Sequence, residues 1–263
     1  MRQNVQKKQK IPRAVAPRRA SLHHSVAQDI GARILKGEFA PGSLLPNEAE
    51  WCVAYGVSRT AVREAIKMLM AKGLILSRPK IGSRVQPRGN WNLLDRDVLV
   101  WYCAAADQKH FLTNMQQVRH ILEPEAAALA ALNRSTEQLA AIEDALAGMR
   151  DAASLTEWNV HDVRFHLAVL TATGNELLVP LGFVIESALG NMFDYTARHN
   201  DNFRKALPLH ADIANAIRRR NPEAARRAVR RLLDDTNSVI GLARNGSRPS
   251  STARKPKDRK RHV

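Results

Sequence analysis

The stretch SRTAVREAIKMLM, residues Ser58–Met70, decides the fold of the first part of this chain. Its apolar residues recur every three or four positions, which predicts an amphipathic helix with one buried face. Ser58 is suited to cap that helix, because a serine hydroxyl accepts a hydrogen bond from the backbone of the first turn. Arg59, Thr60 and Arg63 lie near the helix start, on the face opposite the apolar stripe. The stripe comprises Val62, Ala65, Ile66, Leu69 and Met70.

A helix that starts with Arg, Thr and Arg after a tight turn suits reading of the DNA major groove. The same pattern also fits an ordinary helix with a solvated basic face. The surrounding sequence favours DNA reading. Asn47 and Glu50 form a capping-box pair that starts a preceding helix, and residues 26–35 predict a further helix. A hairpin of two short strands should follow, around a turn at 79–83. This order predicts a winged helix-turn-helix.

Residues 21–87 resemble the GntR family of bacterial transcription regulators. The resemblance rests on GEFAPGSLLPNEAE, on YGVSRTAVREAIKMLMAKGLI and on the later GSRV, which occur in that order. It implies a sequence-specific DNA-binding protein. One departure is Ala49, where many relatives carry Arg, so one DNA contact of those relatives is absent here. The implied DNA-contacting residues are Ser58, Arg59, Thr60 and Arg63 of the helix, with Lys80 and Gly82 of the wing.

The net charge of +16 is concentrated at the two ends of the chain. Residues 1–20 hold seven basic and no acidic residues, and residues 244–263 hold eight basic residues against one acidic residue. Both tails lack apolar periodicity, so we expect them to be disordered. They would add salt-dependent affinity for phosphates, or act only as solvating ends.

The sequence favours a cytoplasmic protein. It contains no apolar run of the roughly 20 residues that a membrane span needs, and no signal-peptide pattern. Cys52 and Cys103 are isolated, so they form neither a disulfide framework nor a zinc motif.

From residue 92 onward the pattern is almost entirely helical. Segments near 92–105, 108–132, 135–150, 154–173, 175–198, 203–219 and 222–243 are separated by Gly, Pro, Asn or polar breaks. We therefore expect a mainly α protein, in which the winged helix-turn-helix precedes an antiparallel helical bundle. The predicted organisation is a basic tail (1–20), a DNA-binding domain (21–87), a linker (88–91), an effector-binding and dimerisation domain (92–243) and a second basic tail (244–263).

Polar residues on the predicted bundle helices are candidates for ligand chemistry. Asp162 and His166 are four residues apart, so both project from one helical face and could hold a divalent metal. His210 starts another helix and could converge on them. The alternative for the Asp–His pair is a hydrogen bond on the helix surface. For Arg119 the alternative is an ion pair with Glu123 on the next turn.

Residues 92–240 resemble the ligand-binding domain of the FadR-like branch of this family, in VRHILEPEAAALAA, DVRFHLAVLTATGNELL and HADIANAIRRRNPEAARRAVRRLL. The resemblance implies an effector site in which Arg119 holds a carboxylate. It also implies a metal (Zn, Mn or Ni) held by one Asp and three His. Asp162, His166 and His210 match three of these ligands, but Leu232 stands where the fourth is expected. The two histidines and the Asp could instead bind a polyhydroxy acid through hydrogen bonds alone.

The run WNLLDRDVLVW (Trp91–Trp101) resembles the linker of regulators of sugar-acid catabolism. It implies a sugar acid, such as galactonate, as effector. Trp91 and Trp101 could equally serve only to pack the linker. We expect a homodimeric repressor that binds an operator in double-stranded DNA, without a membrane partner. One alternative is a metal-dependent enzyme, but the sequence contains no recognisable nucleophile or phosphate-loop motif. The other is a non-specific DNA-binding protein that depends on its tails.

Overall fold

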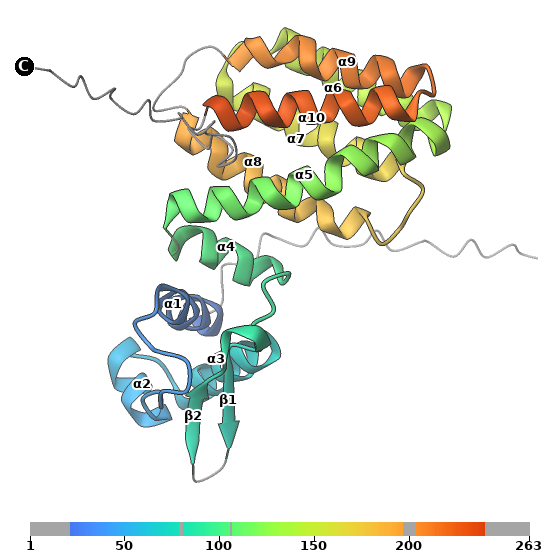
Figure 1. The fold of residues 1–263 in the computed structure, drawn as a ribbon. Coiled ribbons are helices and arrows are strands. Elements are labelled where there is room, and N and C mark those ends of the chain that lie inside the picture. The colour runs from blue at the N-terminus through green and yellow to red at the C-terminus, as the bar shows by residue number, and fades with distance from the viewer. Residues whose placement is uncertain (1–21, 79–80, 106, 197–202, 240–263) are drawn as a thin grey trace, which may run out of the picture. The chain divides into compact units, whose positions relative to one another are not determined.

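The structure, a computed structural model, describes residues 22–78, 81–105, 107–196 and 203–239 (Figure 1). Their contacts divide the chain into two compact units, Met1–Phe111 and Leu112–Val263. Each unit has a hydrophobic core of its own. The chain is mainly helical, with a two-stranded antiparallel sheet in the first unit, as the sequence predicts. The basic tails and Lys80 lie outside the described residues.

Three helices and a hairpin form the winged helix-turn-helix of the first unit. Asn47 caps α2 as predicted: its side-chain oxygen accepts from the backbone N–H groups of Ala49 and Glu50, and the Glu50 carboxylate accepts from the backbone N–H of Asn47. Gly56 then ends α2 in the left-handed conformation, at φ 62°, which a residue with a Cβ rarely adopts. The elements are α1 (Leu22–Lys36), α2 (Glu48–Tyr55), α3 (Arg59–Ala71), β1 (Ile75–Arg78) and β2 (Gly82–Val85).

The wing is a short antiparallel hairpin in which Ile75 pairs with Val85 and Arg78 with Gly82. Ile75 and Val85 are buried in the core of this unit. Their neighbours in sequence, Leu76 on β1 and Arg84 on β2, face solvent, as alternation along a strand requires. Gly82 begins β2 at φ 90°, so the turn of the wing depends on glycine.

Helix α4 (Arg96–Ala105) belongs to the first unit by its contacts. It packs on α1, where a Cβ at Gly31 would lie 2.5 Å from Trp101. Trp91 is also buried in this core, and its Nε1 donates to the carbonyl of Gln86 at 3.0 Å. The sequence places the domain boundary at residues 88–91. The contacts place the division after Phe111, because the apolar face of α4 is covered by α1.

The second unit is built from long helices around an Ala- and Leu-rich core. Pro180 lies in a short 3-10 turn (Val179–Leu181), so the helix predicted from residue 175 begins only at Gly182. None of the described helices is long and apolar enough to cross a lipid bilayer. The helices are α5 (Gln108–Asn133), α6 (Thr136–Asp151), α7 (Leu155–Ala172), α8 (Gly182–Thr196), α9 (Leu207–Arg218) and α10 (Pro222–Val239).

Candidate functional site

Helix α3 presents its basic first turn to solvent. Ser58 caps the helix, since its hydroxyl accepts from the Ala61 amide at 3.3 Å. Arg59 and Thr60 are exposed, and the buried apolar stripe on the opposite face anchors the helix to α1 and α2. Met70, the last member of the predicted apolar stripe, is 38% exposed and not buried. An exposed cationic start on an anchored helix is the geometry that groove reading requires.

Arg63 also lies on the exposed face of α3, but it has a protein partner. Its Nε donates to a carboxylate oxygen of Glu48 on α2 at 2.8 Å, and both side chains are largely exposed. A phosphate or a base edge would therefore compete with Glu48 for this guanidinium. Gly82 is exposed at the start of β2.

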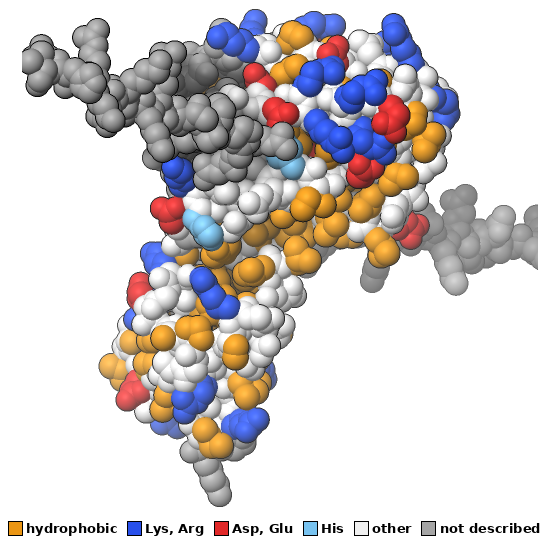
Figure 2. All heavy atoms as spheres, in the orientation of Figure 1, with side chains coloured by type: hydrophobic (Ala, Val, Ile, Leu, Met, Phe, Trp, Pro, Cys, Tyr) orange, Lys and Arg blue, Asp and Glu red, His pale blue; other side chains and the backbone are white. Residues whose placement is uncertain are grey.

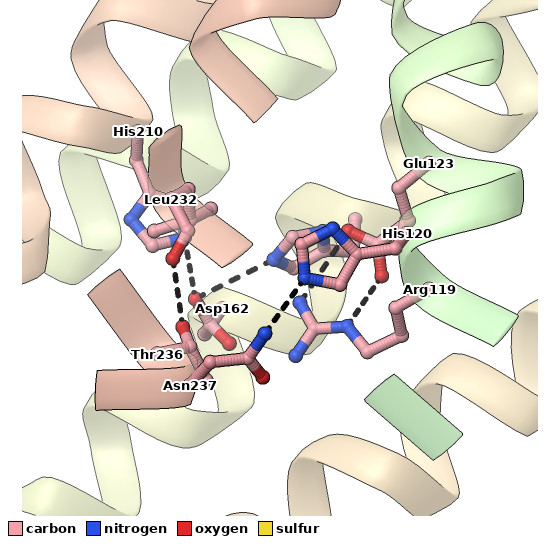
Figure 3. Close-up of polar contacts among 9 residues, drawn as sticks. Arg119, His120, Glu123, Asp162, His210, Leu232, Thr236 and Asn237 are labelled. Carbon is pink, nitrogen blue, oxygen red and sulfur yellow. Dashed lines mark hydrogen bonds and ion pairs between the residues drawn. The ribbon is translucent and has the colours of Figure 1, made fainter. Parts of the chain in front are cut away.

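A second polar cluster lies inside the helical bundle. Asp162 and His166 of α7 and His210 of α9 are at most 5% exposed. Asp162 Oδ1 lies 2.8 Å from His210 Nε2 and 3.9 Å from His166 Nε2. One ligand atom from each of the three residues falls within 4.8 Å of the others. The structure thus brings together the three residues that the sequence singled out, which lie on two helices (Figure 3).

Hydrogen bonds to the far ring nitrogens orient both histidines. His210 Nδ1 donates to the carbonyl oxygen of Ala206 at 2.9 Å. His166 Nδ1 lies 2.9 Å from a carboxylate oxygen of Glu123. A proton on each Nδ1 leaves the lone pair of a neutral ring on Nε2, the atom that faces Asp162. Such outer partners are the usual support of a metal-binding histidine.

At the centre of this cluster, the neutral His210 ring and the Asp162 carboxylate do not form a hydrogen bond with each other. His210 Nε2 is buried and has no well-aligned hydrogen-bond partner among the described residues, although the Asp162 carboxylate is close. A lone pair against a carboxylate oxygen is repulsive unless a proton or a cation lies between them. The donor set, two imidazole nitrogens and one carboxylate, is one that Zn²⁺ accepts. The residues therefore fit a divalent cation.

The electrostatics of the cluster keep both acids charged. Burial raises the pKa of Asp162, but His210, His166 and Arg119 outweigh it, so the net pKa lies below the ordinary value. Burial likewise opposes ionisation of Glu123, yet Arg119 and His166 hold its pKa far below the usual range. The cluster is thus a buried arrangement of two carboxylates, two imidazoles and one guanidinium, which could bind an ion or a charged ligand.

Arg119 is 1% exposed and forms the ion pair with Glu123 that the sequence offered as the alternative to an effector contact. Its Nε donates to one carboxylate oxygen at 2.5 Å, and one Nη is 3.4 Å from the other. The remaining nitrogen, Nη1, is buried without a hydrogen-bond partner among the described residues. An unpartnered buried guanidinium nitrogen is costly, so this atom is available to an anionic ligand.

Leu232 of α10 is 3% exposed and packs in the apolar core, so it supplies no ligand atom. The polar residues of α10 nearest to the cluster come one turn later, where Thr236 Oγ1 donates to the Leu232 carbonyl at 2.9 Å. The side-chain amide of Asn237 lies 2.9 Å from His120 Nε2 on α5 (Figure 3).

A small cavity of about 10 Å³ borders the cluster. Glu123 and His166 form its polar wall, and Val229 of α10 and Phe165 of α7 belong to its apolar wall. A volume of this size is comparable with the roughly 10–15 Å³ that one water molecule requires. A larger ligand at this point would require the helices to separate.

Two relationships in this site were missed by sequence reasoning. Glu123 was considered only as a partner of Arg119, but it also orients His166. The pairing of Asn237 with His120 was not foreseen. The signal for Asn237 is its position four residues after the buried Leu233, where an apolar residue would continue the stripe of α10.

Comparison with known families supports both halves of this description. The family described as bacterial regulatory proteins, gntR family, matches residues 22–85, and the FCD domain matches residues 114–235.

Individual relatives match most of the chain. YieP of Escherichia coli K12, described as an uncharacterized HTH-type transcriptional regulator, is 37% identical over 81% of this chain and 93% of its own length. The galactonate operon transcriptional repressor of that strain is 36% identical over 76% of this chain and 88% of its own. Among solved structures, Lar of Listeria monocytogenes has a TM-score of 0.60 at 17% identity, over 86% of this chain and 100% of that chain, which shows the fold alone.

Proposed function

Because this chain belongs to the GntR family of bacterial transcription regulators and carries an FCD domain, we propose that it is a repressor released from its operator by a small sugar acid. The observation that carries the proposal is the pairing, in one chain, of an exposed basic helix start with a buried cluster of Arg, Asp and His. The matched families and relatives are transcription regulators and not enzymes, so the metal-dependent enzyme is set aside.

In our proposal, α3 enters the major groove by its N-terminal turn. Arg59 and Arg63 would contact base edges or phosphates through their guanidinium groups, with Thr60 and the Ser58 hydroxyl beside them. Gly82 and Lys80 of the wing would approach the minor groove. Two copies of the chain would read the two halves of a palindromic operator, since helix-turn-helix proteins of this kind mirror a two-fold axis. A protein that binds the chromosome in this way acts in the cytoplasm.

The effector would bind at the cluster in the bundle. Among the described residues Arg119 Nη1 is a buried donor without a hydrogen-bond partner, and it is suited to a carboxylate. The similarity to the galactonate operon repressor supports galactonate or a related sugar acid as that carboxylate.

We propose that Asp162, His166 and His210 hold a divalent metal, such as Zn, Mn or Ni, next to the effector. Such an ion supplies positive charge and open coordination positions for oxygen ligands. The second binding mode for these residues is hydrogen bonding to the hydroxyl groups of a polyhydroxy acid without metal.

Binding of the effector can move the protein off DNA only if the two states of the bundle bind it with different affinities. The small volume beside His166 supports such a difference, because a sugar acid would need the helices there to separate. The described geometry would then be the DNA-binding state. The basic tails would add sequence-independent affinity for phosphates.

The test has two arms. DNase footprinting on the DNA next to the gene should reveal a discrete palindromic site, and galactonate with Zn²⁺ or Mn²⁺ should abolish the footprint. Thermal unfolding should show a rise in melting temperature with the same acid, which Arg119→Ala removes, because ligands stabilise the state that binds them. Absence of a discrete footprint would refute the regulator role. A galactonate-induced shift that survives in Arg119→Ala would refute the carboxylate contact.

A further inference from the structure

One exposed ion pair joins the start of α2 to helix α3. Glu48 is the first residue of α2, directly after the Asn47 cap, and its Oε2 atom accepts from Arg63 Nε at 2.8 Å. Trp51, one turn later on α2, is 3% exposed and belongs to the hydrophobic core of the unit. The Glu48 side chain therefore reaches Arg63 from a helix that the core holds in place.

The contact with Glu48 occupies only one edge of the Arg63 guanidinium. An arginine side chain offers five N–H donors, one on Nε and two on each Nη. Neither Nη of Arg63 forms a hydrogen bond with the residues that the structure describes. The side chain is 62% exposed, so a ligand can approach it from solvent. The two Nη atoms form the edge that donates two parallel hydrogen bonds to O6 and N7 of guanine.

The charge of Glu48 acts differently on the two kinds of DNA group that could bind Arg63. The first turn of α2 holds Glu48 and Glu50 and no basic residue. A phosphate carries a full negative charge and is repelled by the Glu48 carboxylate, whereas the O6 and N7 atoms of guanine belong to a neutral base. Glu48 therefore opposes phosphate binding by Arg63 more strongly than guanine binding.

We infer that Glu48 is a positioning residue, which reserves Arg63 for guanine and lowers the affinity of the protein for DNA outside the operator. This inference rests on the proposed function, in which α3 enters the major groove. Because Glu48 holds the Nε edge, the Nη edge is oriented before DNA arrives, and less side-chain freedom is lost on binding. An exposed ion pair contributes little stability, so its removal should change recognition and leave the fold intact.

The experiment compares Glu48→Ala with the wild-type chain on two DNA duplexes by fluorescence anisotropy. The wild-type chain selects one duplex from a random library, and the other duplex is a scrambled version of it. Glu48→Ala should bind the scrambled duplex about three- to tenfold more tightly, and the ratio of the two affinities should fall about fivefold or more. The slope of log affinity against log salt on the scrambled duplex should steepen by about 0.9, the value for one added phosphate contact.

Glu38→Ala is the matched control. Glu38 also accepts from an arginine Nε at 2.8 Å, that of Arg33, and its side chain is 48% exposed against 42% for Glu48. Both variants change the net charge by the same amount, so a general effect of charge would appear in both. In a chain that carries Arg63→Met, Glu48→Ala should change neither the affinity ratio nor the salt slope, because no guanidinium is left to position.

The readouts separate this inference from the proposed function. Unchanged affinity and salt slope on the scrambled duplex, or equal changes in Glu48→Ala and Glu38→Ala, would overturn the positioning role. A fall in the affinity ratio that persists beside Arg63→Met would mean that Glu48 contacts DNA itself, which also overturns it. If the wild-type chain selects no preferred duplex, the proposed regulator role fails, and the inference fails with it.

Discussion

At the scale of single residues, the first unit holds its helices together with side chains that leave the start of α3 free. The Tyr55 hydroxyl of α2 donates to an Asp29 carboxylate oxygen of α1 at 2.6 Å. Arg33 lies over the Phe39 ring at 4.7 Å and pairs with Glu38 at 2.8 Å. The bond between Tyr55 and Asp29 joins α2 to α1, and Arg33 holds the loop that follows α1, while Arg59 remains exposed.

Tyr55→Phe should lower the free energy of unfolding by about 1 kcal/mol at pH 7, because one hydrogen bond between helices is lost. Burial and the bond to Asp29 raise the pKa of Tyr55 to about 12. The neutral hydroxyl is thus favoured by folding, so its contribution is complete below about pH 10 and is lost as the pH rises through 12. Urea unfolding followed by circular dichroism from pH 7 to 11 measures this difference. A gap that stays constant to pH 11 and beyond would contradict the assignment.

Arg59→Ala should reduce the preference for operator over random DNA by about 1–3 kcal/mol, the value of one bidentate base contact. Gel-shift titrations with both DNAs at one salt concentration provide the measurement. Arg219→Ala, which removes an exposed arginine of the second unit, serves as the control and should leave the preference unchanged. An equal loss of affinity for both DNAs would mean that Arg59 contacts only phosphate.

At the scale of elements, α4 is joined to the end of α3 by one buried cation. Lys72 follows the last residue of α3, and its ammonium lies 2.7 Å from Asp95 and 2.8 Å from Asp97, which flank the start of α4. The same group is 5.5 Å from the centre of the Trp101 ring. Helices α3 and α4 are therefore parts of one packed unit.

Lys72→Met should lower the free energy of unfolding of the first unit by about 1–3 kcal/mol at pH 7, since two charge-assisted hydrogen bonds are lost. Burial opposes ionisation of Asp95, but Lys72 and backbone donors lower its net pKa. The contribution of the charged Asp95 to the free energy of unfolding is present above its ordinary pKa near 4 and is lost as the pH falls below that value.

The difference between the wild-type protein and Lys72→Met should therefore shrink in denaturant unfolding as the pH falls below the ordinary pKa of about 4. Lys67→Met is the matched control, because Lys67 is 70% exposed and its ion pair among the described residues is with the neighbouring Glu64 on α3. Its effect should stay below about 0.5 kcal/mol. Equal effects of the two variants would mean that the contact between α3 and α4 contributes no stability.

At the scale of the whole molecule, an apolar surface runs along α5. Val118, Ile121, Leu129 and Leu132 recur at helical spacing and are 36–76% exposed. Figure 2 shows apolar side chains gathered over this helix. Glu125 lies on the same face of α5 and pairs with Arg226. Exposed apolar residues gathered in this way mark an interaction surface, and we propose that a second copy of the chain covers this one.

Ile121→Glu should shift the protein from dimer to monomer at micromolar concentration, because a charge would be buried without a partner in the interface. Sedimentation velocity measures the mass. Leu177→Glu, at a residue that is 82% exposed outside the α5 surface, should leave the dimer intact. A wild-type monomer, or a dimer that tolerates Ile121→Glu, would refute this interface.

Removal of metal should lower the melting temperature of the second unit. Dialysis against EDTA takes away an ion that binds only the folded state, and added Zn²⁺ should restore the original value. His210→Ala should abolish the response, since it removes one of the three proposed ligands. An unchanged melting temperature after metal removal would favour direct hydrogen bonding of the acid.

Local patterns by themselves determined the elements and the family of this chain. Each of these patterns acts within a few residues, so it can be recognised in the sequence. They are the helix periodicity, the Asn47 and Ser58 caps and the Gly56 turn. The same locality placed Asp162 and His166 on one face of α7.

Only the tertiary structure decided which residues of different helices meet. Glu123 orients His166 from α5, Asn237 reaches His120 from α10, and α4 packs on α1 through Gly31 and Trp101. Local periodicity does not predict these contacts. Helix packing determines which faces come together and how far each helix is displaced along its neighbour.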